Sequence, residues 1–212
     1  MNPRPLLRRS AAGFTLVEIL VTISVIALLA TLSIVAMGHA SRTANREKTK
    51  AYLKAIEMQL ENFKNDNGTY PRPKEGSETT TALVAGNNYP VGGAITLYQA
   101  LTGDGDDAME GGDSGSLGKP GSLGDGYKVY WPDADPNGSQ RISRQADGKW
   151  FIADGFGIPF QYLVPPPVDP RRADDFEALK AKYKNPRMYD LWSYGGTKDE
   201  NFTDQNTWIR NW

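Results

Sequence analysis

Phe14 to Met37 reads FTLVEILVTISVIALLATLSIVAM, and this stretch decides the fold because Glu18 is its only charged residue. About 24 residues of helix extend roughly 36 Å at 1.5 Å per residue, which is long enough to cross the hydrocarbon core of a membrane. The mean hydropathy of the whole chain is −0.52, a value typical of soluble proteins. We therefore predict one membrane-spanning helix over 14–37, joined to a hydrophilic remainder.

The segment before this helix reads MNPRPLLRRSAAG and contains three arginines but no acidic residue. A secretory signal peptide also begins with basic residues, but its apolar core is only about 7–15 residues long and its small cleavage-site residues follow that core. Here the small residues, Ser10 to Gly13, come before a longer apolar run. Residues 1–13 are therefore predicted to be a basic leader peptide, and a cut after Gly13 would keep the helix in the mature protein.

The basic residues on the two sides of the predicted helix favour opposite orientations in the membrane. The arginines of the leader favour a cytoplasmic N-terminus, because positive residues accumulate on the cytoplasmic side. Basic residues also follow the helix and favour the opposite orientation: Arg42, Arg46, Lys48 and Lys50.

The junction Gly13-Phe14-Thr15-Leu16-Val17-Glu18 resembles the processing motif of type IV prepilins, since a basic leader precedes it and an uninterrupted apolar run follows it. The resemblance implies that a prepilin peptidase cuts after Gly13 and methylates the new N-terminal residue, Phe14. It also implies a single-pass inner-membrane protein with a cytoplasmic N-terminus. The globular domain would be periplasmic and assembled into a periplasmic or surface fibre.

Glu18 has two interpretations. A carboxylate at membrane depth costs a few kcal/mol unless it is paired or reaches the interface, and a side chain near the end of a helix can extend to that interface. Alternatively, cleavage creates an ammonium group on Phe14, and Glu18 of one subunit contacts that group on a neighbour in a fibre. Such a pair would set the register of assembly more than its stability. The processing motif favours this assembly role.

An amphipathic pattern continues the helix over residues 38–65. Tyr52, Ile56, Leu60 and Phe63 recur at three to four residues, which is the period of one helix face. Asn67-Gly68 is a typical helix stop, because glycine readily adopts left-handed backbone angles. This face is predicted to pack on the globular domain.

Residues 66–212 are predicted to form an exported α+β domain in which the long helix packs on a small antiparallel sheet. The expected features are a helix over 94–101 ending at Gly103, a Gly/Asp-rich flexible surface insertion near 103–126, a strand over 127–131, a turn and strand over 154–162 with Pro159 at the start of the strand, a helix over 174–183 inside a proline-bounded insertion, and a strand over 189–194.

Two segments of this domain resemble the major pseudopilins of type II secretion systems. Residues 65–71, NDNGTYP, resemble the turn that ends the long helix in that family, and residues 154–162, DGFGIPFQY, resemble a second family segment. The resemblance implies a type IV pilin-like fold. It also implies a structural subunit of a secretion pseudopilus, with further copies of itself, minor pseudopilins and an inner-membrane assembly platform as partners.

The last loop, 197–208, contains the acidic residues Asp199, Glu200 and Asp204. Major pseudopilins bind calcium in this loop through aspartates and backbone carbonyls, so the resemblance implies Asp199 and Asp204 as calcium ligands. Calcium prefers about six to eight oxygen ligands, and two aspartates with carbonyls supply part of such a cage. A solvated acidic loop is the alternative.

Other function classes receive little support from the sequence. A net charge of −1 gives no electrostatic footprint for nucleic acid, and the absence of cysteine excludes thiolate metal sites and cysteine nucleophiles. No phosphate-binding loop or zinc motif is present, so no enzymatic activity is expected. Two alternatives stay open: a major or minor pilin of a type IV pilus, and a single-span membrane-anchored enzyme or binding protein.

Overall fold

The computed structural model describes residues 13–112, 124, 127–138, 140, 142–167, 173–197 and 202–212. The chain divides into two compact units, 1–42 and 43–212. Its regular elements in chain order are α1 (Leu16–Asn67), η1 (Ser77–Thr79), β1 (Thr81–Val84), β2 (Asn87–Pro90), α2 (Gly92–Thr102), η2 (Pro132–Ala134), β3 (Ser143–Ala146), β4 (Lys149–Ile152), β5 (Gln161–Leu163), α3 (Ala173–Lys182), β6 (Asp190–Ser193) and β7 (Ile209–Arg210).

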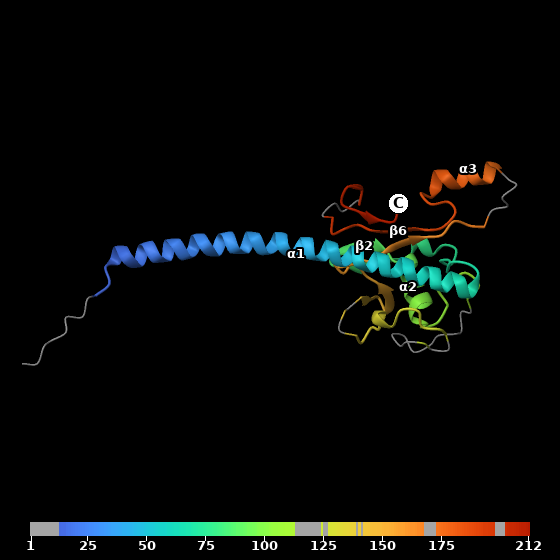
Figure 1. Ribbon diagram of the computed structural model, residues 1–212, viewed down its shortest axis with the longest axis horizontal. Helices are drawn as coiled ribbons and strands as arrows, with labels where there is room; N and C mark the ends of the chain where they lie inside the picture. Colours follow the sequence, from blue (N-terminus) through green and yellow to red (C-terminus); the bar gives the residue numbers. More distant parts are fainter. Residues whose placement is uncertain are drawn as a thin grey trace, which may run out of the picture. The chain divides into compact units, whose positions relative to one another are not determined.

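Helix α1 confirms the predicted long N-terminal helix (Figure 1). It ends two residues beyond the expected position, at Asn67, where Gly68 has a φ of 79° and its N–H donates to the carbonyl of Lys64 at 2.7 Å. This is the left-handed termination that the Asn67-Gly68 pair predicted.

The second unit is built around the C-terminal half of α1. Tyr52, Ile56 and Leu60 are buried, as the amphipathic pattern predicted, whereas Phe63 is only half-buried. Leu53, which the predicted face left out, is buried as well. These side chains share one hydrophobic core with residues of α2 and of strands β4, β5 and β6.

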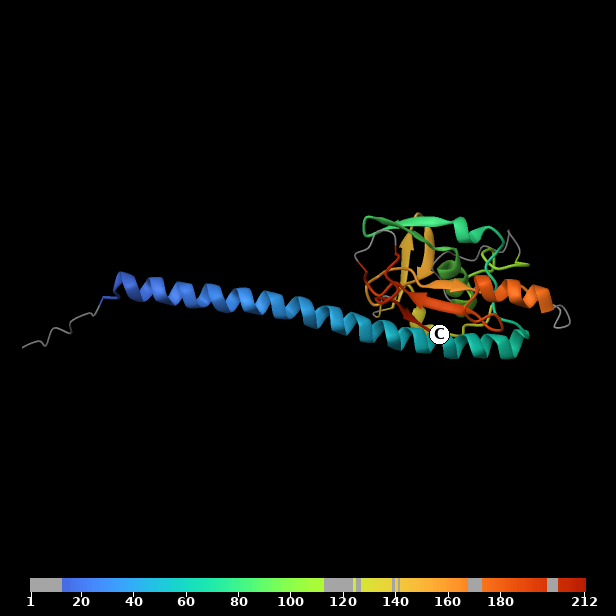
Figure 2. The same ribbon diagram turned by 90° about the horizontal axis from the view of Figure 1, so that it is seen from above.

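Within the described ranges the strands form three small antiparallel sheets, and the fold is α+β as predicted. Strands β5, β6 and β7 make a three-stranded sheet with β6 in the centre, and the pairs β1–β2 and β3–β4 are separate hairpins. Figure 2 shows β3 and β4 side by side in yellow. The strand predicted within 189–194 and the helix predicted within 174–183 are confirmed as β6 and α3.

Two hairpins, β1–β2 and β3–β4, were not predicted, although the sequence of one contains a clear turn signal. Asp147 and Gly148 join β3 to β4 with φ angles of 50° and 76°, and Ala85 and Gly86 join β1 to β2 with φ angles of 50° and 90°. Asp-Gly between two short strands is a strong hairpin signal. Ala85-Gly86 is a weaker one, because alanine rarely adopts a positive φ.

The prediction of a strand over 127–131 was wrong. The backbone N–H groups of Tyr130 and Trp131 both donate to the carbonyl of Leu101, at 2.9 and 2.8 Å, so this segment caps the end of α2. Side chains also fasten it to the end of α1, because Lys128 and Tyr130 donate to the Asp66 carboxylate at 2.5 and 2.9 Å. These long-range contacts replace strand pairing.

Two further expectations need correction. Strand β5 begins at Gln161, because Pro159 makes only an isolated bridge with Ala153 and carries no N–H for a ladder. Residues 103–112 are not a loose surface loop, since Gly103 ends α2 with a φ of 70° and Asp104 is buried. The remainder of the insertion, apart from Gly124, lies outside the described residues.

Candidate functional site

Thr15 and Glu18 cap the N-terminus of α1. The backbone N–H and the hydroxyl of Thr15 donate to Glu18 Oε2 at 3.1 and 3.0 Å, and the N–H of Glu18 donates to Thr15 Oγ1 at 3.2 Å. This reciprocal arrangement is a capping box, in which each side chain satisfies a backbone donor that the helix itself leaves unpaired. The Glu18 carboxylate also lies where the positive end of the helix dipole stabilises negative charge.

Gly13 and Phe14 precede this cap in irregular backbone. A Cβ atom on Gly13 would have no heavy atom within 4 Å, and Phe14 is 78% exposed. The Gly13–Phe14 peptide bond is therefore not shielded by the part of the chain that the structure describes.

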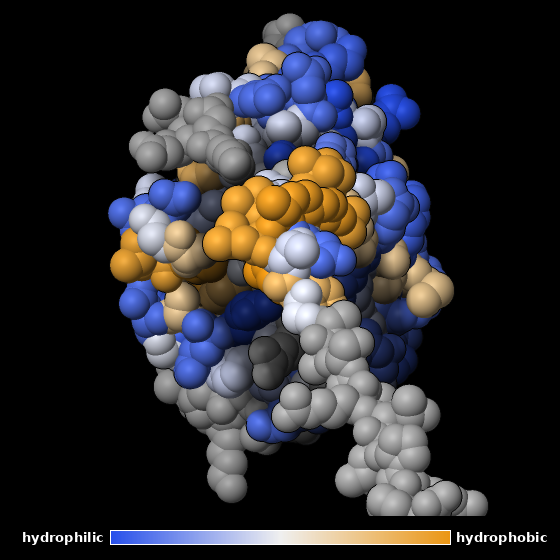
Figure 3. Space-filling model, turned by 90° about the vertical axis from the view of Figure 1, so that its left-hand side faces the viewer, coloured by the Kyte–Doolittle hydropathy of each residue, from blue (hydrophilic) through white to orange (hydrophobic). Residues whose placement is uncertain are grey.

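Large apolar side chains along the first part of α1 are exposed. They are Leu16, Val17, Ile19, Leu20, Val21, Ile23, Val25, Ile26, Leu28, Leu29, Leu32, Ile34 and Met37. Figure 3 shows apolar side chains gathered at this end of the helix. A soluble monomer rarely exposes such a continuous apolar surface, so it requires a bilayer or other protein as its surroundings.

The few hydroxyl groups of this segment are satisfied within the helix. Thr22, Ser24, Thr31 and Ser33 donate to backbone carbonyls three or four residues earlier, at 2.5 to 2.8 Å. Helices in an apolar medium must pair their polar groups internally, because no water is available there. By length and composition, α1 is apolar enough to cross a membrane.

Gly13 and the exposed Phe14 thus precede an uninterrupted apolar helix whose first turn contains the capping residue Glu18. Residues 8–34 match the prokaryotic N-terminal methylation motif. This match confirms the prepilin-type resemblance of the N-terminal segment. The methylation motif covers only the N-terminal part of the chain.

Curated relatives extend the similarity beyond the methylation motif. The type II secretion system core protein G of Klebsiella pneumoniae is 34% identical over 87 residues, which is 39% of this chain and 62% of the relative. The protein of the same name from Pseudomonas aeruginosa is 34% identical over 83 residues (39% and 58%), and that from Dickeya chrysanthemi is 32% identical over 93 residues (42% and 61%). The chain therefore spans about three fifths of the length of these relatives. No solved structure matches the chain.

The end of β6, which leads into the last loop, is held by the buried carboxylate of Asp154. Asp154 Oδ1 accepts the N–H groups of Phe156 and Ile158 at 2.8 and 2.9 Å, while Oδ2 accepts the Ser193 hydroxyl at 2.5 Å. Ser193 Oγ in turn accepts the N–H of Gly195 at 2.9 Å. Burial raises the pKa of the Asp154 carboxyl, and the hydrogen bonds from Ser193 and the backbone oppose that shift.

Helix α1 contacts both the last loop and the turn that follows Asp154. Arg46 Nη1 donates to the carbonyl of Thr207 at 2.8 Å, and the N–H of Gly155 donates to Thr49 Oγ1 at 3.0 Å. A Cβ atom on Gly155 would lie 2.3 Å from the carbonyl of Asn45, so the turn needs glycine to approach the helix this closely. Segment 154–162 therefore joins α1 to β6, and Arg46 of α1 joins the helix to the last loop.

The predicted calcium ligands are only partly described. Asp199 lies outside the described residues, whereas Asp204 lies in an exposed turn. Asp204 Oδ1 accepts the N–H of Asn206 at 3.2 Å, and its carbonyl accepts the hydroxyl of Thr207 at 2.8 Å. Within the described ranges no three acidic, histidine or cysteine residues converge. Asp204 contributes one carboxylate, so the described residues do not by themselves form a calcium cage.

Proposed function

We propose that this protein is a structural subunit of a type II secretion pseudopilus. A prepilin peptidase would cut after Gly13 and methylate Phe14, and the helix would then anchor the subunit in the inner membrane with a cytoplasmic N-terminus. The subunits would polymerise through their apolar helices. The match of residues 8–34 to the methylation motif carries this proposal, and the similarity to secretion core proteins G supports the choice of system.

The exposed apolar face of α1 is consistent with this role. The same side chains could contact lipid in the single subunit and other helices in the fibre, because both surroundings are apolar. Further copies of the chain, minor pseudopilins and an inner-membrane assembly platform would be the partners. The role is structural and needs no catalytic residue.

The decisive test is the intact mass and N-terminal sequence of the protein purified from membranes of a host with an active prepilin peptidase. We expect a mature chain that begins at N-methylated Phe14, and an uncut precursor in the Gly13→Val variant. Ala11→Gly is the matched control and should be processed normally. Because a Cβ on Gly13 meets no neighbouring atom, loss of processing in Gly13→Val would reflect the peptidase and not misfolding.

A wild-type chain that still begins at Met1 would overturn the proposal and favour a membrane-anchored enzyme or binding protein. If the chain is processed, a deletion strain separates the two kinds of fibre. Loss of secreted proteins with surface pili intact supports the pseudopilus, whereas loss of surface pili with secretion intact supports a type IV pilus.

A further inference from the structure

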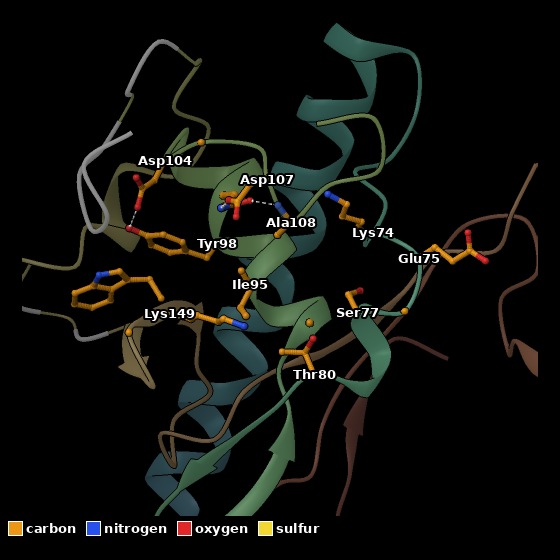
Figure 4. Close-up of a pocket in the computed structure, with 16 residues that line it drawn as sticks. Lys74, Glu75, Ser77, Thr80, Ile95, Tyr98, Asp104, Asp107, Ala108 and Lys149 are labelled. Carbon is orange, nitrogen blue, oxygen red and sulfur yellow. Dashed lines mark hydrogen bonds between the residues drawn. The ribbon is translucent and has the colours of Figure 1, made fainter. Parts of the chain in front are cut away.

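A cleft of about 410 Å³ lies in the part of the globular unit between residues 74 and 150 (Figure 4). Its walls come from the segment 74–80, helix α2, the turn 104–108 and the loop of the β3–β4 hairpin. A volume of this size suits a small molecule, since binding pockets usually measure roughly 300–1,000 Å³. None of its lining residues belongs to the methylation motif or to the last loop.

Two lysines supply hydrogen-bond donors to the cleft. In Figure 4, Lys149 extends from the hairpin towards Ile95, whereas Lys74 lies on the opposite side and extends towards Asp107 and Ala108. Neither lysine forms an ion pair with a described residue. Both ammonium groups can therefore donate to a ligand.

The wall also contains a hydroxyl that no described residue satisfies. Ser77 Oγ is buried and has no hydrogen-bond partner in the part of the chain that the structure describes. Native proteins leave few buried polar atoms unpaired, and such atoms often belong to a binding site. Ser77 is one of the residues that line the cleft, so this unpaired hydroxyl lies within its wall.

Two carboxylates, those of Asp104 and Asp107, also line the cleft, and each accepts a hydrogen bond from a neutral side chain. Asp104 accepts the hydroxyl of Tyr98 at 2.7 Å, and Asp107 accepts the side-chain amide of Gln99, whose Oε1 receives the N–H of Ala108. An ionised carboxylate can accept about four hydrogen bonds, so Asp107 can accept more from a ligand.

The charges that line the cleft nearly balance. Lys74 and Lys149 are opposed by Glu75, Asp104 and Asp107, although Glu75 points away from the other labelled residues. A simple anion would meet carboxylates, and a simple cation would meet ammonium groups. A ligand rich in hydroxyl groups suits both, because each hydroxyl donates and accepts.

Apolar surface accompanies these polar groups. Ile95 and Trp150 line the cleft, and the Trp150 ring stacks on Tyr98 with 6.2 Å between centroids and 25° between planes. The half-buried indole is supported by the core, so it offers a rigid flat surface beside the polar groups.

We propose that this cleft binds a saccharide. A sugar ring would pack against Trp150 and Ile95, while its hydroxyls donate to Asp107 and accept from Lys74 and Lys149. The inference rests on the side chains of the cleft and is independent of the proposed assembly into a fibre.

The test is isothermal titration of the full-length protein with cellobiose and with di-N-acetylchitobiose, in a detergent that has no sugar headgroup. The two probes distinguish plain glucans from N-acetylated cell-wall-like glycans. We expect one of them to bind, and at least tenfold weaker binding in Lys149→Gln and Asp107→Ala. Lys182→Gln, an exposed lysine on α3 outside the cleft, is the matched control and should bind as the wild type does.

The thermal unfolding midpoint of each variant separates lost binding from lost folding. Lys149 is exposed and has no ion pair with a described residue, so Lys149→Gln should unfold at the wild-type temperature. The proposal is overturned if neither disaccharide produces heat, or if Lys149→Gln binds as tightly as the wild type. The zwitterionic dipeptide Ala-Ala tests the alternative of a peptide site. If Ala-Ala binds more tightly than either disaccharide, and if Lys149→Gln weakens that binding, the saccharide proposal is overturned in favour of a peptide site.

Discussion

At the scale of single residues, Asp154 is the buried group whose loss should have the largest local effect. Asp154→Ala would leave the N–H groups of Phe156 and Ile158 and the hydroxyl of Ser193 without their acceptor. Each unsatisfied buried group costs about 1–3 kcal/mol, but the variant also removes the cost of burying the carboxylate, so we expect the free energy of unfolding to fall by about 2–4 kcal/mol. Urea unfolding checks this, with Asp133→Ala on the exposed η2 turn as the control.

The same carboxyl should give a defined pH dependence. Burial raises its folded-state pKa above the ordinary value of 3.8, so the folded state binds more protons than the unfolded state between these two values. The contribution of Asp154 to stability therefore falls as pH rises through that window. Compared with Asp154→Asn, the wild type should gain stability as pH is lowered from 7 towards 4. A difference in unfolding free energy that does not change with pH would contradict this.

The capping box predicts a second residue-scale effect. Thr15→Ala removes the hydroxyl that receives the N–H of Glu18, and the loss of such a cap costs about 1 kcal/mol of helix stability. We expect faster amide hydrogen exchange in the first turn of α1 in micelles. Thr22→Ala is the control, because the Thr22 hydroxyl only donates to the carbonyl of Ile19. Equal exchange in both variants would rule out the cap.

At the scale of elements, the C-terminal half of α1 packs into the hydrophobic core through one of its faces. Ile56 is fully buried, whereas Met58, two residues later, is 59% exposed. Ile56→Ala should lower the free energy of unfolding by about 2–5 kcal/mol, because it removes buried methyl groups and leaves a cavity. Met58→Ala should change it by less than about 0.5 kcal/mol. Chemical denaturation of the two variants checks the prediction, and similar losses would contradict the packing of α1.

Element prediction from the sequence succeeded where the signal was local. The apolar run before Met37, the three-to-four residue period around Ile56 and the Asn67-Gly68 stop all act within a few residues, and α1 follows them. Segment 127–131 has strand-like composition, but hydrogen bonds to Leu101 and Asp66, which lie far away in the sequence, decide its conformation.

At the scale of the whole molecule, calcium binding in the last loop stays a prediction. If Asp199 and Asp204 bind calcium with loop carbonyls, saturating calcium should raise the unfolding temperature, since a ligand at 100 times its Kd stabilises the folded state by about 2.7 kcal/mol. Asp204→Asn should abolish the shift, and Asp133→Asn should retain it. Thermal unfolding in calcium and in EGTA gives the answer, and identical midpoints would exclude a structural calcium ion.

The sequence by itself determined the membrane-length helix, the methylation motif at its start and the amphipathic face that continues it, because hydropathy, spacing and turn chemistry are properties of neighbouring residues. Only the tertiary structure decided how the globular unit is organised. It brought Asp154 to Ser193 and Arg46 to Thr207, and it closed the cleft between α2 and the β3–β4 hairpin. These groups lie 39 residues or more apart in the first two contacts, and no local propensity specifies which distant donor a buried acceptor will meet.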